Sequence, residues 1–584
     1  MGILPMTGVR EYKWPLFVVP RTRHEQDARA TTAPPMINRW AYLLVLLLIA
    51  AGALALRLPR LAARPMHNDE AVNTVKFNDL WTSGKFAYDP NEYHGPTLYY
   101  LTLPVVWLSG AKDFAQTTEV TYRVLPVIFG VGLILLLALV ADGIGRGGVL
   151  WAGLFTAVSP AMVFYSRYYI HEMLLVFFSF AAVACGWRYR RSGHVGWAVA
   201  CGAMVGLSYA TKETWVFALA ASAGAGVAAA TIWRVLLKPV HHGLHFRPRA
   251  LVAAALAFVV VFYVAFSGFF TQPRAPLDAV LAYFHYTQRA SGGVHDHPWN
   301  YYLKILTWWH AGRGPVWTEA TIVALAVVGF LFAVFRKPVA NAAAEGQDDP
   351  PVPRWHHTIP IFPPFVRFMG FYTLFLVIGF SVIPYKTPWC MLGFLQGMIV
   401  LAGFACGQVV HLVRHPAARG LASMVFVAAA AHLAWEADRA TNNYFARDVR
   451  QRDKFAASNY NPYVYGHTSN DIYTFTRRMA EIAQVAPKGE KTYVQVVTAD
   501  CWPIPFYLRS FTNTGYWAEP PANLSGDVII GPADVWDRLN VEGAKRKYQA
   551  TSFGLRPGVV LWMYVEEGLW DKLRAMWETK SARR

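Results

Sequence analysis

Two adjacent carboxylates, Asp69 and Glu70, follow the first long apolar run of the chain. Charged groups so close to hydrocarbon are energetically costly and usually functional. A carboxylate placed there can take the proton of an acceptor hydroxyl as a general base, a role that transfer of a sugar with inversion requires. We therefore predict that Asp69 is the catalytic carboxylate, and that Glu70 and the later Glu172 complete an acidic side of the site.

The same acids have a structural explanation that the sequence leaves open. Acidic residues in the first turn of a helix offset the helix macrodipole and can cap its free N–H groups. Glu172 stands at the entrance to another apolar run, where this explanation applies equally. The sequence alone does not decide between a cap and a catalytic acid.

Basic residues in the short connections between apolar runs form the second group of candidates. Lys212, Lys386 and Arg167 lie in such connections. Cations there can stabilise the charge that develops on a phosphate leaving group, although a lysine that snorkels at a membrane boundary needs no ligand. If the donor is a lipid-linked phosphosugar, we predict that all three hold its phosphate. Four neighbouring side chains are predicted to contact substrate: His67, His94, His171 and Tyr385.

A metal site is considered at His295 and His297, which flank Asp296. Because a spacing of two places both rings on one side only in an extended segment, we predict no metal site there. A divalent ion beside Asp69 and Glu70 is compatible with two acids, but the available basic residues make it unnecessary.

The composition is that of a membrane protein. Of the 584 residues, 55% are hydrophobic and 15% are charged, whereas about 25% are charged in an ordinary soluble domain. The formal net charge of +18 does not indicate nucleic acid as a partner, because much of the Lys and Arg lies in short connections where it sets membrane topology. The five cysteines include no CxxC pair, so neither a zinc site nor a disulfide framework is supported.

The apolar runs predict eleven membrane spans, at about residues 40–58, 124–141, 149–165, 170–187, 195–210, 214–233, 250–268, 319–335, 366–383, 388–411 and 420–435. One further run, 97–109, would cover only about 20 Å as a helix, whereas the hydrocarbon layer is about 30 Å thick. Counting it as a span would also invert the excess of Lys and Arg in the inner loops. We therefore predict a juxtamembrane helix at 97–109, a cytoplasmic N-terminus and an external C-terminus.

This topology divides the chain into a cytoplasmic tail (1–39), a transmembrane domain (40–435) with long external loops (59–123 and 269–318), and a soluble periplasmic or extracellular domain (436–584). In the soluble domain, predicted strands alternate with predicted helices, which indicates an α/β fold. The strands are 492–497, 527–530 and 559–564, and the helices are 471–485 and 533–539. The topology also places all the candidate segments on the outer side of the membrane.

The chain resembles the polytopic GT-C glycosyltransferases, which include the protein O-mannosyltransferases and the lipid A aminoarabinose transferases. The resemblance rests on the Asp69-Glu70 pair early in a long first external loop and on the external segment from Ser166-Arg167 to Glu172 that opens a later span. The chain is still more similar to bacterial and archaeal proteins labelled as associated with flippase activity in glycosylation. This likeness is carried by His67-Asn68-Asp69-Glu70-Ala71, Tyr93-His94-Gly95-Pro96, Thr211-Lys212-Glu213, Ile383-Pro384-Tyr385-Lys386-Thr387-Pro388-Trp389 and the segment from Asp500-Cys501-Trp502 to Tyr507-Leu508-Arg509.

The resemblance implies a GT-C-like helical membrane domain and a polyprenyl-phosphate sugar as donor, with an acid of the Asp69-Glu70 pair as the catalytic or acceptor-binding carboxylate. Many relatives carry Asp where this chain has Glu172, so the reach of that carboxylate differs by one methylene. We therefore expect an inverting glycosyltransferase that acts on a protein, glycan or lipid acceptor at the outer face of a bacterial inner membrane. No other cofactor is implied.

Two alternatives belong to other functional classes. A translocase for lipid-linked sugars, or its non-enzymatic partner, would use the same cations to grip the lipid phosphate. An inactive scaffold that presents the C-terminal domain to partners would not need Asp69. Because the charges cluster at one membrane face and not in the middle of the spans, the sequence favours the enzyme over the translocase.

Overall fold

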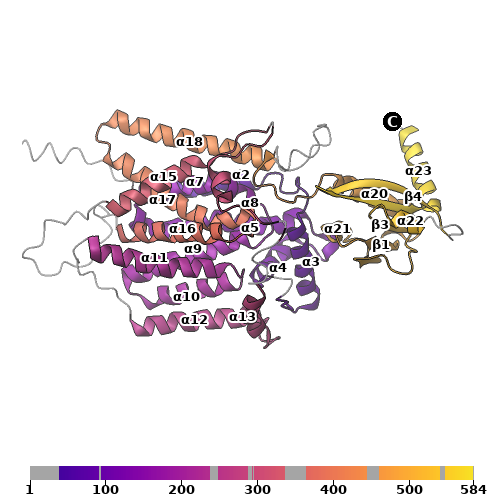
Figure 1. Ribbon diagram of the computed structural model, residues 1–584, viewed down its shortest axis with the longest axis horizontal. Coiled ribbons are helices and arrows are strands. Elements are labelled where there is room, and N and C mark those ends of the chain that lie inside the picture. Colours follow the sequence, from indigo (N-terminus) through magenta and orange to yellow (C-terminus); the bar gives the residue numbers. More distant parts are fainter. Residues whose placement is uncertain are drawn as a thin grey trace, which may run out of the picture.

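The computed structural model describes residues 38–90, 94–236, 247–286, 293, 295–312, 314–335, 363–442, 460–539 and 546–582. The predicted cytoplasmic tail lies almost entirely outside the described residues. The described chain forms a long helical bundle and a smaller domain that contains a β-sheet, joined end to end (Figure 1).

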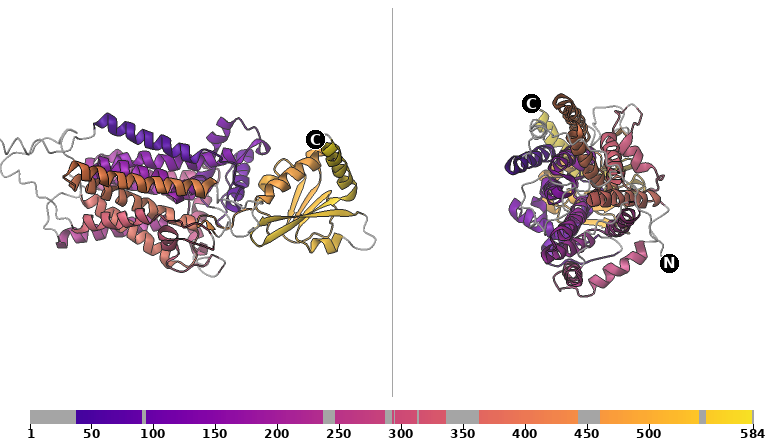
Figure 2. Two further views of the ribbon diagram at one scale, coloured as in Figure 1. Left: turned by 90° about the horizontal axis from the view of Figure 1, so that it is seen from above. Right: turned by 90° about the vertical axis from the view of Figure 1, so that its left-hand side faces the viewer.

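The bundle consists of long helices that run nearly parallel to one another (Figures 1 and 2). Their bounds are α2 (Arg39–Arg57), α5 (Glu119–Leu136), α7 (Arg146–Val158), α9 (Glu172–Ser192), α10 (Val195–Tyr209), α11 (Trp215–Leu236), α12 (Pro248–Phe266), α15 (Ala320–Phe335), α16 (Pro363–Val382), α17 (Leu392–Leu412) and α18 (Pro416–Asn442). Each of the eleven predicted apolar runs falls on a helix. Among the described residues, seven helical segments are long and apolar enough to cross a membrane by length and composition. The count of eleven crossings stays a prediction.

One predicted span is divided in two. The run 149–165 forms most of α7 and the short helix α8 (Pro160–Tyr165), which are separated at Ser159. The break follows from Pro160, the first residue of α8. Proline lacks a backbone N–H and is therefore favoured in the first turn of a helix and not in its interior. Ser159 caps α8 by accepting a hydrogen bond from the backbone N–H of Met162.

Small residues set the closest helix contacts. A Cβ atom on Gly403 of α17 would lie 2.5 Å from Gly148 O of α7, and one on Gly202 of α10 would lie 2.0 Å from Ala254 O of α12. Glycines at such points let two helix backbones approach directly, as is common in membrane bundles.

Two short helices lie between the end of the bundle and the sheet: α3 (Asn68–Ser83) and α4 (Thr97–Ser109) (Figure 1). Helix α3 begins with a capping box and ends at Gly84, whose φ of 68° fits glycine. Helix α4 is the predicted juxtamembrane helix, and it packs against α3 and α5 at this end of the bundle.

The described C-terminal part from residue 460 to residue 582, which we call the tail domain, contains one five-stranded sheet with the order β2-β1-β3-β5-β4. β1 pairs in parallel with β2 and β3, and β5 pairs antiparallel with β3 and β4. The strands are β1 (Val494–Val497), β2 (Thr514–Trp517), β3 (Val528–Gly531), β4 (Tyr548–Arg556) and β5 (Val559–Glu566). The helices are α20 (Asp471–Val485), α21 (Ile504–Tyr507), α22 (Val535–Leu539) and α23 (Glu567–Ala582).

This arrangement confirms the predicted fold class, a helical membrane domain followed by an α/β domain. The predicted strands coincide with β1, β3 and β5, whereas β2 and β4 were not predicted. The predicted boundary at residue 436 falls within α18, and the described chain resumes at residue 460. The exact boundary therefore stays a prediction.

Candidate functional site

The N-terminus of α3 carries the Asp69-Glu70 pair. His67 caps this helix, because its Nδ1 accepts a hydrogen bond of 3.1 Å from the backbone N–H of Asp69. The carboxylate of Glu70 completes the capping box by accepting a hydrogen bond of 2.9 Å from the backbone N–H of His67. Both acids therefore lie in the first turn of a helix, but their side chains occupy different surroundings.

Glu70 is fully buried among cations. Arg123 donates two hydrogen bonds of 2.7 Å to its two oxygens, and Arg64 donates to both at 3.2 Å. Besides the N–H of His67, the backbone N–H of Tyr169 also donates to this carboxylate, at 2.9 Å. Burial alone would raise the pKa of Glu70, but Arg123 and Arg64 outweigh it and hold the pKa at about 2. Glu70 is therefore ionised at neutral pH and already fully bonded.

Asp69 has the opposite environment. Its side chain is 51% exposed, and its Oδ1 lies 3.8 Å from His67 Nδ1. The structural explanation that the sequence left open thus applies to Glu70, and the catalytic part of Asp69 stays a prediction. Glu70 makes the cap and the internal ion pair, whereas Asp69 presents a carboxylate at the surface of the site. A catalytic part for Glu70 stays a prediction, but its bonds are those of a positioning group.

Glu172 and Lys212 form an ion pair. Lys212 Nζ, in the turn between α10 and α11, donates to Glu172 Oε1 at the start of α9. The side chains are only 12% and 7% exposed. The structure thus brings together a predicted catalytic acid and a predicted phosphate-binding cation, and it shows them neutralising each other.

Lys386 links the loop between α16 and α17 to the segment that contains His297. Its Nζ donates to the backbone oxygens of His297, at 3.1 Å, and of Ile383. The adjacent Tyr385 forms an isolated antiparallel bridge with Asp296. Lys386 is 1% exposed, whereas Tyr385 is 44% exposed, and its contact with substrate stays a prediction.

Arg167 is also engaged with backbone oxygens. Its Nη2 donates to Pro59 O at 2.7 Å and to Arg60 O at 3.1 Å. Burial, together with Arg64 and Arg123, lowers the pKa of Arg167 to about 10. The three predicted phosphate-binding cations are therefore all bonded within the protein in the described structure.

His94 and His171 lie beside each other, with ring centres 5.1 Å apart. His94 Nδ1 is 2.8 Å from Glu213 Oε2. Burial lowers the pKa of His171 well below its ordinary value, so this imidazole is neutral. The chain approaches closely here: a Cβ atom on Gly95 would lie 2.2 Å from Ala210 O. Glu213 belongs to the Thr211-Lys212-Glu213 motif but was not predicted to be a site residue.

His67 stands in an aromatic enclosure. Its ring lies 5.5 Å from Tyr168, 5.7 Å from Trp389 and 5.3 Å from His467, measured between centroids. The guanidinium of Arg64 stacks on the ring of Tyr168 at 3.8 Å. Burial lowers the pKa of His67.

His295 and His297, considered above as metal ligands, both face the hydroxyl of Tyr465. His295 Nδ1 lies 2.6 Å from it and His297 Nε2 lies 3.4 Å from it. Within the described ranges, no group of three or more His, Cys, Asp or Glu residues is placed to hold a metal ion.

A cavity lies between α9, α11, α16 and α17, with Glu172 in its lining. Most of its other lining side chains are apolar, among them Leu175, Phe180 and Leu376. It therefore joins the ion pair of Glu172 to an apolar space within the bundle.

The main residues that sequence reasoning missed are Arg64 and Arg123. Arg123 was not predicted to be a site residue, although it lies in the first part of a largely apolar helix. A cation at such a position needs a buried acid, and that signal pointed to Glu70. The contributions of His467 and Tyr465 carried no local signal, because they come from a segment about 400 residues further along the chain.

Comparisons with known proteins were made for the whole chain. The family model described as dolichyl-phosphate-mannose-protein mannosyltransferase matches residues 99–271. ArnT from Cupriavidus metallidurans bound to undecaprenyl phosphate superposes with a TM-score of 0.56 at 14% sequence identity, covering 89% of this chain and 97% of that one. Its apo structure gives a TM-score of 0.55 at 15% identity with the same coverage, 89% and 97%. An Archaeoglobus fulgidus oligosaccharyltransferase tethered to an acceptor peptide gives a TM-score of 0.48 at 13% identity, covering 83% and 65%. No curated protein matches the chain.

The matches agree on the architecture. The family model covers the segments of Glu172 and Lys212 but not Asp69, because it begins within α4 at residue 99. The ArnT structures extend the likeness over most of the chain, at identities that establish the fold and not the chemistry. The matched family model is that of a mannosyltransferase, as the resemblance to the protein O-mannosyltransferases implied. The chain therefore has the membrane fold of the GT-C glycosyltransferases.

Proposed function

We propose that this protein transfers a sugar, with inversion, from a polyprenyl-phosphate carrier to an acceptor hydroxyl. The observation that carries the proposal is the half-exposed Asp69 at the N-terminus of α3, beside a Glu70 that is locked in an ion pair. Support also comes from the matched family model, described as a mannosyltransferase that uses dolichyl-phosphate-mannose, and from the matched structure bound to undecaprenyl phosphate.

The proposed step is a single displacement. Asp69 accepts the proton of the acceptor hydroxyl while the acceptor oxygen attacks the anomeric carbon. The bond between that carbon and the phosphate oxygen breaks, and the phosphate leaves with the electron pair. Inversion follows because one attack occurs from the face opposite the leaving group.

The leaving phosphate would replace Glu172 as the partner of Lys212. The ammonium is already held at the edge of an apolar cavity, so a phosphate there could place the start of its isoprenoid chain among apolar side chains. The surroundings of this phosphate would include Arg167, Lys386 and the exposed Tyr385. The buried cations Arg64 and Arg123 outnumber Glu70 and add a positive field that favours an anion nearby.

The proposed setting is the outer face of a bacterial inner membrane, with the tail domain outside. His67, His94 and His171 remain proposed substrate contacts. The acceptor is a protein, glycan or lipid hydroxyl. Helix α3, which begins at the Asp69-Glu70 pair, lies with α4 and the tail domain at one end of the bundle (Figure 1), which supports a reaction at one membrane face.

The function is tested with purified protein in liposomes that contain polyprenyl-phosphate sugars carrying a radiolabel in the sugar. We expect the label to move from the lipid to a membrane acceptor fraction, with release of polyprenyl phosphate. A panel of sugars identifies the donor. Label that stays on the lipid and only changes leaflet would contradict the proposal and favour a translocase.

The ion pair of Glu172 and Lys212 gives a prediction about stability. Lys212→Met leaves a nearly buried carboxylate without its cation, so we expect a loss of about 3–5 kcal/mol of unfolding free energy. Adding Glu172→Gln removes the uncompensated charge and should restore at least half of that loss. Unfolding in detergent measures the cycle. Losses that simply add in the double variant would show that the two side chains do not interact.

A further inference from the structure

We propose that the tail domain is a working part of the active site, in which Tyr507, Thr468 and Arg556 are positioning residues for Asp69. They hold the turn from Met66 to Asp69, which we call the Asp69 turn. The inference rests on the proposed function for its catalytic readout, but the contacts themselves are independent of it. It gives the tail domain a task in catalysis beyond recognising an acceptor or covering the site.

Both backbone groups of Met66 are bonded by side chains from beyond the bundle. The backbone N–H of Met66 donates to the hydroxyl of Tyr507 at 2.9 Å. The hydroxyl of Thr468 donates to the backbone oxygen of Met66 at 2.6 Å. Met66 is completely buried, so these hydrogen bonds are shielded from water. The start of the Asp69 turn is therefore fixed from the tail side.

Asn68 directly precedes Asp69 and is held by β4 and the segment before α21. With its amide oriented to satisfy both neighbours, its NH2 donates to Trp502 O at 3.1 Å and its oxygen accepts from Arg556 Nη1 at 3.0 Å. Arg556 is itself fixed by an ion pair with Asp500. A rigid guanidinium thus bonds the side chain next to the proposed base.

His67 connects the tail to the backbone of Asp69. Because Nδ1 of His67 accepts the N–H of Asp69, the neutral ring carries its proton on Nε2. Nε2 therefore donates to the backbone oxygen of Tyr465, which lies 3.0 Å away. The backbone oxygen of Tyr465 selects the tautomer that caps α3 and orients Asp69.

The tail domain is also anchored around the turn. Arg509 donates to Thr117 O at 2.7 Å, and the hydroxyl of Tyr473 donates to Ala62 O at 2.8 Å. Removing one contact to the Asp69 turn should therefore leave the domain docked and only loosen the turn. Reactive groups tolerate little displacement, since an error of about 1 Å can cost about 100-fold in rate.

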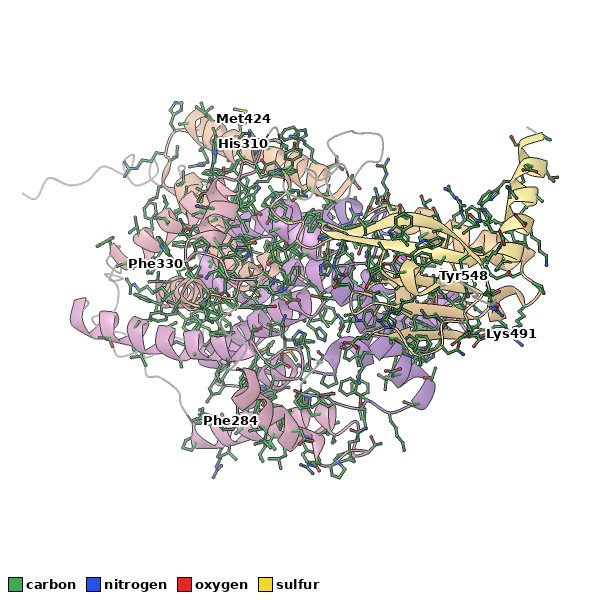
Figure 3. All side chains as sticks on the ribbon, turned by 45° about the vertical axis from the view of Figure 1, so that its right-hand side comes forward. Phe284, His310, Phe330, Met424, Lys491 and Tyr548 are labelled. Atoms are coloured by element: carbon green, nitrogen blue, oxygen red, sulfur yellow. The ribbon has the colours of Figure 1, made fainter. Side chains whose placement is uncertain are left out.

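The test uses the full-length protein with Tyr507→Phe, Thr468→Val and the double variant. We expect the double variant to lower kcat about 10–100-fold, while KM for the polyprenyl-phosphate sugar changes less than about 2-fold. We expect kcat and KM to respond differently because the proposed contacts to the donor phosphate, Lys212, Lys386 and Arg167, lie on other segments. Arg546→Ala is the matched control, since it breaks an ion pair with Asp527 of 3.1 Å in the same domain. Arg546 lies two residues before Tyr548, which Figure 3 marks on the tail domain.

Hydrogen exchange of the peptide that covers residues 64–72 supplies a readout that needs no turnover. We expect its amides to exchange at least about 10-fold faster in the double variant and at the wild-type rate in Arg546→Ala. Wild-type kcat or unchanged exchange in the double variant would overturn the positioning role. If the wild-type protein transfers no sugar, the proposed function fails, and exchange still decides whether the tail holds the turn.

Discussion

Asp69→Asn should abolish turnover while leaving the protein folded. The asparagine keeps the size of the side chain but cannot accept a proton at neutral pH, and a general base commonly contributes about 100- to 10,000-fold to a rate. Because the side chain is 51% exposed, we expect the unfolding free energy to change by less than about 0.5 kcal/mol. Initial rates of sugar transfer in liposomes measure the effect.

Asp79→Asn is the control for this experiment. Asp79 is an exposed acid of the same helix, α3, and it lies towards the opposite end from Asp69. The variant should transfer sugar at the wild-type rate. A stable Asp69→Asn protein with wild-type kcat would remove Asp69 from the mechanism.

Glu70→Ala should be among the most destabilising single changes in the chain. It leaves Arg123 and Arg64 buried without their shared carboxylate, and breaking a buried ion pair in this way costs about 3–5 kcal/mol. Activity should fall as well, because the capping box that orients Asp69 is lost. Unfolding in detergent, followed alongside transfer activity, measures both effects.

Arg123→Lys tests whether geometry or charge matters at this pair. Arg123 makes two hydrogen bonds of 2.7 Å to one carboxylate, and a lysine cannot reproduce that fork. We expect only partial recovery of stability compared with Arg123→Ala. As a surface control, Arg574→Ala removes an exposed pair with Asp571 and should cost less than about 1 kcal/mol. A Glu70→Ala protein as stable as this control would contradict the structural role of Glu70.

Much of the fold could be predicted because membrane helices and buried strands have strong local signals. Long apolar runs predicted every helix of the bundle, and the run 97–109 forms helix α4 as expected, while its juxtamembrane position stays a prediction. The strands β2 and β4 were missed because their residues are mixed in polarity and only partly buried, so they lack a clear alternation.

The site was predicted less completely, because the sequence shows where charged residues lie but not which residues they pair with in the fold. The sequence placed Asp69 and Glu70 together, but their separate parts depend on Arg123, which lies 53 residues from Glu70. Likewise, the sequence predicted that Lys212 binds phosphate, and only the folded chain shows its ion pair with Glu172. Pairings of this kind are tertiary and have no local pattern.

The bond between Met66 and Tyr507 joins residues 441 positions apart. At translation rates of roughly 5–20 residues per second, Tyr507 leaves the ribosome about 20–90 s after Met66. The membrane bundle can therefore be inserted long before the Asp69 turn receives its last contacts. Synthesis itself thus delays activity, and a chain truncated before the tail would enter the membrane without a completed site.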